Sequence, residues 1–337
     1  MTIKMNDIAK IAHVSKSAVS LAINSKPGIS EETRQKILDV IAHEGYKPLR
    51  KRRKSEPSAK PQIKFLVITS SGVVKQEYNS LPFFSSLIYS LTTRIREMDG
   101  NLETITIQID DLARQIKELH SDKSSSFLVL GTDLSAKQVE LLTKSLERVV
   151  FIDTYFSAID ANFVTMDNYQ GARIAAQYIL SKGYKDIGYL ASDHAMANFS
   201  ERRRGFREAL MEKNIKISNN HFYFISPTDI EPHGLNMASI VHDKSPRAIF
   251  CEDDYIALRL IKSAILAGLR VPQDLAIMGF DDIFEGTLIS PELTTIHVQI
   301  DQIVNQALLQ IKFQQTQQNW QPQKTLIATK LIARQSL

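Results

Sequence analysis

The chain has 337 residues, of which 43% are hydrophobic and 23% are charged, and these proportions are typical of globular proteins. Its length favours two or three domains. No apolar run approaches the roughly 18 residues of a membrane span, the N-terminus lacks the apolar core of a signal peptide, and the single cysteine, Cys251, excludes an internal disulfide. We therefore expect a cytoplasmic protein.

Charge is distributed unevenly along the chain. Residues 1–60 contain 13 Lys and Arg against 6 Asp and Glu, a net charge of +7, whereas the rest of the chain carries a net charge of −3. A basic head on a slightly acidic body is expected when the head contacts a polyanion such as nucleic acid. A solvated basic tail is the alternative.

The basic head begins with two segments of helical periodicity. In "NDIAKIAHV", Ile8, Ile11 and Ala12 recur at the spacing of one helix face. In "VSKSAVSLAIN", Ser15 is a suitable N-cap for a second helix that runs to about Asn24. A short helix with small polar residues in its first turn either caps a helical bundle or enters a groove of DNA.

A third helix follows the loop "NSKPGIS". Ser30 is suited to cap it, Ile37, Leu38 and Ile41 lie on one predicted face, and Gly45 marks its end. Two short helices joined by a tight turn, with a third packed against them, form a helix-turn-helix. In that motif the second helix lies in the major groove of DNA.

The segments "DIAKIAHVSKSAVSLAIN" and "SEETRQKILDVIAHEGYKP" resemble the DNA-binding head of the lactose-repressor (LacI/GalR) family of bacterial transcription regulators. The resemblance implies base-reading places at Lys16, Ser17 and Leu21, and places that support the helix or contact phosphates at Ser15, Ser20 and Asn24. Leu21 stands where many members carry a polar side chain, so an apolar contact with a thymine methyl is expected there. His13 replaces the usual Gly of the turn, which strains the backbone if that position needs a positive φ.

The linker "LRKRRKSEPSAKP" departs from the family pattern. The family places a hinge helix here that inserts a leucine into the minor groove, whereas this chain has a run of basic residues followed by Pro57. We expect Arg50, Arg52 and Arg53 to hold phosphates or a narrow minor groove by charge. A flexible solvated linker remains an alternative, and Leu49 is the one candidate for an apolar wedge.

Beyond the linker, strand-like runs from "KFLVIT" to "LTTIHV" alternate with helical stretches, which favours parallel sheets in two subdomains. The resemblance extends to this body and implies an α/β fold: an all-α helix-turn-helix head, then two flavodoxin-like subdomains of the periplasmic-binding-protein type. The expected domains are the head at 1–48, a basic hinge at 49–62 and an effector-binding and dimerisation domain at 63–337. Within the last, the expected N-subdomain spans 63–161 plus 291–323, and the C-subdomain spans 162–290 plus 324–337.

The cleft between the two subdomains is the expected effector site, because ligands of open α/β sheets bind beyond the carboxyl ends of the strands. Asp153 and Asp281 each end a strand-like run and Arg202 begins "RRRGF". Carboxylates and a guanidinium suit a polyhydroxylated ligand, and by the resemblance Phe83 and Phe84 lie at the mouth of the cleft. As alternatives, the two aspartates cap helices and the two phenylalanines belong to the core.

Four further positions near the cleft carry weaker expectations. Arg203 and Arg204 are expected to face solvent. The pair Asp253–Asp254 matches an Asn-Asp pair of the family, expected to be structural, with Asp254 nearer the ligand.

Enzyme motifs are absent from the sequence. It contains no G-x-G, no G-x-S-x-G and no histidine pair at zinc spacing, so no cofactor, metal or catalytic residue is expected. The expected protein is a homodimeric repressor that binds operator DNA and a sugar or sugar derivative. The alternative is a regulator that needs a corepressor, either a purine-type ligand or a phosphocarrier protein. A dimer is favoured over a tetramer because no heptad segment follows the last strand.

Overall fold

The computed structural model describes residues 3–23, 26–46, 61–122, 124–228, 240 and 246–337. The chain divides into two compact units, Met1–Ala59 and Lys60–Leu337, which we call the head and the body. Asn24, Arg50, Arg52 and Arg53, four residues of the expected DNA-binding set, lie outside the described residues.

The head contains three short helices, α1 (Met5–Ile11), α2 (Lys16–Ile23) and α3 (Glu31–His43). Their small core consists of Ile8, Ala9, Ala12, Val19, Ala22 and Ile37. The expected caps are present, since the backbone N–H of Ala18 donates to Oγ of Ser15 at 3.1 Å and that of Thr33 donates to Oγ of Ser30 at 3.2 Å. The helix-turn-helix expected from the sequence is therefore the fold of the head.

Two apolar residues of the head are more exposed than the helical periodicity predicts. Ile11 is 46% exposed and Leu38 is 38% exposed. Three short helices enclose only a narrow core, which Ile8, Ala12 and Ile37 already fill, so the buried stripe of each helix is narrower than the predicted face.

The turn between α1 and α2 has the strained geometry expected for it. His13 adopts a φ of 54°, in the left-handed region. Its N–H donates to the carbonyl of Lys10 and the N–H of Val14 donates to that of Ala9, at 3.2 and 3.0 Å. These two bonds are those of a Schellman motif, whose left-handed position is usually occupied by Gly.

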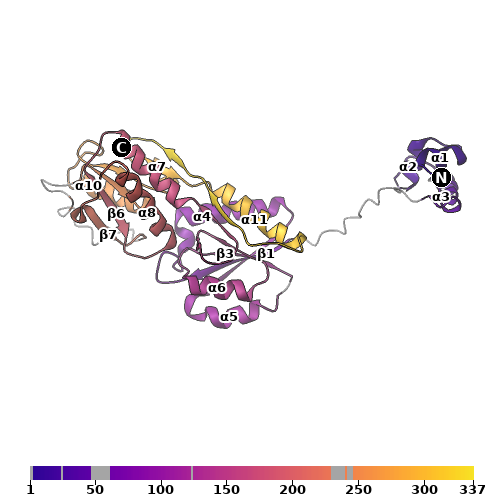
Figure 1. The fold of residues 1–337 in the computed structure, drawn as a ribbon, viewed down its shortest axis with the longest axis horizontal. Coiled ribbons are helices and arrows are strands. Elements are labelled where there is room, and N and C mark those ends of the chain that lie inside the picture. Colours follow the sequence, from indigo (N-terminus) through magenta and orange to yellow (C-terminus); the bar gives the residue numbers. More distant parts are fainter. Residues whose placement is uncertain (1–2, 24–25, 47–60, 123, 229–239, 241–245) are drawn as a thin grey trace. The chain divides into compact units, whose positions relative to one another are not determined.

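The first lobe of the body is built on a six-stranded parallel sheet of order β11-β5-β4-β3-β1-β2 (Figure 1). Its strands are β1 (Gln62–Thr69), β2 (Asn101–Gln108), β3 (Ser126–Leu130), β4 (Val149–Ile152), β5 (Phe163–Met166) and β11 (Lys324–Ile327). Helices α4 (Pro82–Glu97) and α11 (Ile300–Thr316) cover one face, and α5 (Leu112–Leu119) and α6 (Ala136–Ser145) cover the other.

The second lobe is built on a four-stranded parallel sheet of order β7-β6-β8-β9. Its strands are β6 (Ile187–Ser192), β7 (Phe222–Ile225), β8 (Ala248–Cys251) and β9 (Ala276–Met278). Helices α7 (Asn168–Ser181) and α8 (Ala197–Met211) pack on one face, and α10 (Asp254–Leu266) packs on the other. Short 3₁₀ turns occur at Tyr78–Ser80, Ile109–Asp111, Asn219–His221 and Phe284–Thr287.

The chain crosses between the lobes later than the sequence analysis expected. The boundary at 162 is wrong, because β5 pairs with β4 in the first sheet and the crossing follows it. The boundary at 324 is wrong for the same reason, because β11 pairs with β5. The boundary at 291 is also early, since Thr294 still bridges Met278 of the second lobe.

Two of the crossing segments pair with each other. β10 (Thr295–His297) and β12 (Lys330–Ile332) form a separate two-stranded antiparallel sheet. The run "LTTIHV" was expected to join a parallel sheet, but its partner is another crossing segment. Alternation of apolar residues identifies a strand but does not indicate which sheet the strand joins. The boundaries between the two subdomains therefore follow only from the strand pairing.

Candidate functional site

The first turn of α2 presents small and charged side chains outward. Lys16 and Ser17 are exposed, and Ser20 and Leu21 are half-buried. Ser15 is committed to the helix end, because its Oγ caps α2 and lies 2.8 Å from Oγ of Ser17. Lys16 is therefore the expected base-reading side chain that is both exposed and charged.

The C-terminal end of α2 is tied to α3 by an arginine that the sequence analysis did not single out. Arg34 donates to the carbonyl of Leu21 at 3.2 Å and to that of Lys26 at 2.7 Å. The carbonyl of Leu21 also accepts from the backbone N–H of Lys26 at 3.0 Å, so Arg34 adds a second bond at this helix end. Arg34 thereby holds the orientation of α2 against the rest of the head.

All five side chains expected at the effector cleft line one cavity between the lobes of the body. Its lining residues are Val73, Phe83, Phe84, Thr132, Asp153, Met196, Asn198, Phe199, Arg202, Thr228, Asp253, Tyr255 and Asp281. Phe83 and Phe84 come from the first turn of α4, Asp153 and Asp281 follow β4 and β9, and Arg202 lies on α8. The cavity therefore lies beyond the carboxyl ends of both parallel sheets.

The cavity is small in this structure. Its volume is about 40 Å³, whereas pockets that enclose a small organic ligand measure about 300–1,000 Å³. Across it, the backbone N–H of Phe83 in the first lobe donates to the hydroxyl of Tyr255 in the second, at 3.0 Å. The structure thus has closed lobes, and a sugar-sized ligand requires them to separate.

Arg202 is the central polar side chain of the cavity and is only 3% exposed. It donates to Oδ1 of Asp281 at 2.9 Å, to Oδ1 of Asn168 at 2.8 Å and to the carbonyl of Glu252 at 2.5 Å. Its guanidinium also lies 3.7 Å from the ring centroid of Phe280. These contacts fix a buried cation among hydrogen-bond acceptors, as a buried charge requires.

Asp153 is held in place by neutral donors. Its carboxylate accepts from the hydroxyl of Thr132 at 2.5 Å and from the side-chain amide of Asn198 at 2.9 Å. Burial raises the pKa of Asp153 to about 7. Its φ of 57° lies in the left-handed region, a strain that is typical of functional sites.

Asp281 is a second strained and buried carboxylate, with a φ of 117°. Burial raises its pKa to about 6, and the neighbouring Arg202 opposes that rise. Neither Asp281 nor Asp153 caps a helix of the described chain; the aspartates that do so include Asp167 on α7 and Asp253 on α10. The alternative interpretation of the two expected aspartates as caps is therefore wrong.

Phe83 and Phe84 belong to the core as well as to the cavity. Both are buried and pack edge-on against each other, with ring centroids 5.5 Å apart. Phe83 and Phe84 are therefore both core residues and cavity residues, the two alternatives that the sequence left open.

The pair Asp253–Asp254 has the opposite arrangement to the expected one. Asp253 lines the cavity while it caps α10. Asp254 is structural, since it accepts from the hydroxyl of Thr295 at 2.6 Å and from the N–H of Ile283 at 3.0 Å.

Arg203 was expected to face solvent, but it forms an ion pair with the buried carboxylate of Glu252 at 2.5 Å. Arg203 follows Arg202 on α8, and its side chain reaches Glu252, the residue directly after β8. Arg204 is half-exposed and pairs with Glu201 on its own helix.

Asn198, which is not among the residues expected from the sequence, joins the two halves of the site. Its amide donates to Asp153 and its carbonyl oxygen accepts from Asn168 at 3.0 Å, and Asn168 in turn accepts from Arg202. Asn198 precedes Arg202 by four residues, one helical turn on the same face. That spacing was the available signal.

Among the described residues, no group of three or more His, Cys, Asp and Glu could hold a metal ion. No helix among the described residues is long and apolar enough to cross a membrane.

Comparisons with known proteins agree with this arrangement. Residues 4–48 match the model of the lacI family of bacterial regulatory proteins, and residues 176–337 match a periplasmic binding protein-like domain. The repressor PurR of Actinobacillus pleuropneumoniae serotype 3 is 28% identical, with 99% of this chain and 98% of that protein covered. The ribose operon repressor of Haemophilus influenzae is 29% identical, with 87% and 86% covered.

Two solved structures have the same fold. The regulator CelR in complex with cellobiose aligns with a TM-score of 0.71 at 19% identity, covering 99% of each chain. The Lac repressor bound to ONPG aligns with a TM-score of 0.70 at 18% identity, covering 100% of each chain.

Proposed function

Since this chain belongs to the lacI family of bacterial regulatory proteins, and is thus a DNA-binding transcriptional repressor rather than an enzyme, we propose that its effector is an unphosphorylated sugar bound between the lobes. The observation that carries the proposal is the set of acidic side chains in the cavity. Of the residues that the structure describes, Asp153, Asp253 and Asp281 line it together with one cation, Arg202.

Three carboxylates offer acceptors for the hydroxyl groups of a sugar, and Arg202 offers donors in a fixed fork. A phosphate group is disfavoured there, because the described lining offers one cation, Arg202, which already pairs with Asp281. The aromatic rings of Phe83 and Phe84 supply apolar surface for a sugar ring. A neutral polyhydroxylated ligand therefore fits this lining better than a sugar phosphate.

Binding is coupled to DNA affinity through the movement of the lobes. A ligand favours the arrangement for which it has the higher affinity, and the closed cavity of about 40 Å³ has no room for a sugar. The sugar therefore stabilises a more open arrangement. In the proposed mechanism this change respaces the two heads of a dimer and releases the operator.

A purine-type effector is the second candidate, because relatives of 28% identity carry the name PurR. An aspartate and an arginine also suit the donors and acceptors of a purine ring. The first candidate predicts that a neutral sugar stabilises the folded chain, and the second predicts that a purine does so.

We propose that the chain binds its operator as a homodimer, in which the head of a second copy contacts the second half-site. Two identical heads suit the two halves of a pseudopalindromic operator.

On the second lobe, α10 and the turn after β9 expose an apolar face that we call the α10 face. It contains Leu266, 76% exposed, and Leu288, 68% exposed, which line the same hollow.

The α10 face is suited to pair with a copy of itself. Lys262 and Glu285 lie within the same surface hollow of about 640 Å³. A twofold axis through this hollow covers its apolar side chains and puts Lys262 and Glu285 of both copies in the same interface.

The test is thermal unfolding of the full chain against neutral sugars, their phosphates and purines. A ligand of the folded body stabilises it by about 2.7 kcal/mol at a hundredfold excess over its Kd. We expect a shift with one neutral sugar, none with its phosphate, and none in Arg202→Ala. A shift only with a purine favours the second candidate, and no shift with any small molecule favours a phosphocarrier protein.

Arg202→Ala needs a matched control, because it leaves Asp281 buried without its cation and lowers the melting temperature by itself. Arg204→Ala removes an exposed arginine two positions further along α8. We expect Arg204→Ala to keep the ligand shift, and both variants to bind duplexes selected by the wild-type chain. A normal ligand shift in Arg202→Ala would contradict the proposed site.

A further inference from the structure

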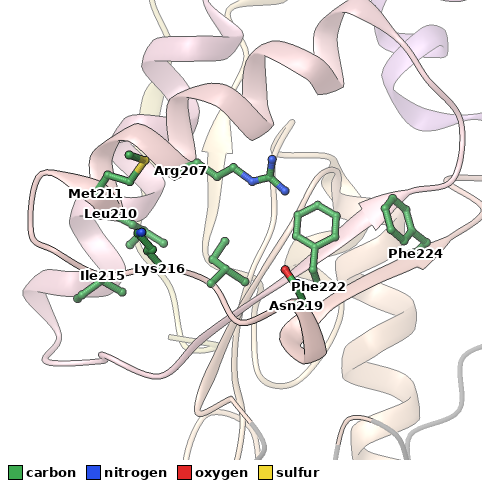
Figure 2. Close-up of a pocket in the computed structure, with 9 residues that line it drawn as sticks. Arg207, Leu210, Met211, Ile215, Lys216, Asn219, Phe222 and Phe224 are labelled. Carbon is green, nitrogen blue, oxygen red and sulfur yellow. The ribbon is translucent and has the colours of Figure 1, made fainter.

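A second groove of the body lies on the outer edge of the four-stranded sheet, where α8 passes beside β7 (Figure 2). We call it the α8–β7 groove. Its volume is about 580 Å³ and its lining residues are Arg207, Leu210, Met211, Ile215, Lys216, Ile217, Asn219, Phe222 and Phe224. None of them lines the interlobe cavity, so this groove is separate from the proposed effector site.

One side of the groove is a sheet edge. Among the described strands β7 pairs only with β6, and it is the edge strand of its sheet. The carbonyl of Ile225 faces β6, since it accepts from the N–H of Asp193 at 3.0 Å. Successive residues of a strand alternate, so the backbone N–H and carbonyl of Phe224 face outward, where another strand can pair with them.

The other side of the groove is apolar and exposed. Met211 is 58% exposed at the end of α8, and Phe224 is 60% exposed on β7. Figure 2 shows Met211 and Ile215 on one side of the groove and the rings of Phe222 and Phe224 on the other. The groove therefore offers apolar surface along a strand edge that is unpaired among the described residues.

The charges of the groove have one sign. Arg207 and Lys216 line it, and no carboxylate of the described residues does. Arg207 lies over the ring of Phe222, 4.8 Å from its centroid. Neither cation forms an ion pair with a described residue, whereas Arg203 and Arg204 on the same helix pair with Glu252 and Glu201. Two exposed cations without acidic partners favour an anionic ligand.

We propose that the α8–β7 groove binds an extended acidic segment of a partner protein by strand addition to β7. The backbone of the segment pairs with the outer edge of β7, alternate apolar side chains lie between Met211 and Phe222, and its carboxylates pair with Arg207 and Lys216. Main-chain hydrogen bonds supply affinity in this mode, and the side chains supply specificity.

The experiment measures fluorescence anisotropy of labelled octapeptides with the full chain. One peptide alternates glutamate with valine and the other alternates lysine with valine. We expect the acidic peptide to bind at least tenfold more tightly, and Arg207→Glu or Lys216→Glu to weaken its binding at least tenfold. Because the basic residues 1–60 also attract acidic peptides, the comparison between variants is decisive.

Lys213→Glu is the matched control. Lys213 is exposed three residues before Lys216, but it does not line the groove. We expect this variant to bind the acidic peptide as the wild type does. Equal weakening by Lys213→Glu and Lys216→Glu would reduce the effect to net charge and overturn the proposal.

Strand addition is tested by N-methylation of alternate peptide residues, which removes backbone donors while the charges remain. Methylation in one of the two registers should weaken binding at least tenfold. Unchanged binding in both registers would exclude strand addition, and equal affinity for the acidic and basic peptides would overturn the proposed pairing of carboxylates with Arg207 and Lys216.

Discussion

At the scale of single residues, Asp153 and Asp281 make the body sensitive to pH. Their pKa values in the folded chain, about 7 and about 6, exceed the value of about 4 of an unfolded aspartate. Between pH 4 and 7 the folded state therefore binds more protons than the unfolded state, so stability falls as pH rises through this window. We expect the free energy of unfolding to be lower at pH 8 than at pH 5 by at least about 1.4 kcal/mol, the equivalent of one pKa unit.

Asp153→Asn separates this effect from other titrations. The amide cannot ionise and its oxygen can still accept from Asn198, so the variant should lose less stability between pH 5 and 8 than the wild type does. Calorimetric unfolding at both pH values measures the difference. Asp160→Asn, a change at an exposed position, should leave the pH dependence unchanged. If Asp153→Asn has the same pH dependence as the wild type, the carboxyl of Asp153 in the folded wild type is ionised over the whole range from pH 5 to pH 8.

At the scale of elements, the ends of α1 and α3 use the same motif with different residues. His13 has a φ of 54° after α1, and Gly45 has a φ of 63° after α3. Each is followed by the hydrogen bond that closes a Schellman motif, from Val14 to Ala9 and from Tyr46 to Ile41. A left-handed conformation costs an L-residue about 1–2 kcal/mol and a Gly almost nothing.

His13→Gly should therefore stabilise the head by about 1 kcal/mol, since it removes the left-handed strain and the side chain of His13 is exposed. Hydrogen exchange of the head amides in the full chain measures this gain as about fivefold slower exchange. Gly45→Ala is the reciprocal variant, because a Cβ there meets no atom within 4 Å and only backbone strain is added. Its head amides should exchange faster. Faster exchange in His13→Gly would contradict this account of the turn.

At the scale of the whole molecule, the proposed dimer depends on the α10 face. A glutamate at Leu266 or Leu288 places a charge in the middle of an apolar contact, where it cannot be solvated. We expect Leu266→Glu and Leu288→Glu to sediment as monomers at micromolar concentration and to lose operator affinity, because a single head contacts only one half-site.

The matched control for the dimer is Met211→Glu. Met211 is another exposed apolar residue of the same lobe, 58% exposed, but it lies in the α8–β7 groove. It should sediment as the wild type does. A dimer that persists in Leu266→Glu would exclude the α10 face as the interface.

The sequence by itself determined the class of the head, since caps such as Ser15 and Ser30 act within one turn of the chain and a local pattern is sufficient to identify them. It also placed five side chains at the interlobe cavity, because strand ends and the family motif mark Asp153, Arg202 and Asp281 without knowledge of their contacts. Only the tertiary structure decided which sheet takes β5 and β11, because strand pairing joins residues far apart in the chain. It also decided that Asp253 rather than Asp254 lines the cavity, that Arg203 is paired with Glu252, and that Asn198 links Asp153 to Arg202. These are side-chain contacts between different elements, and their geometry follows from packing rather than from local pattern.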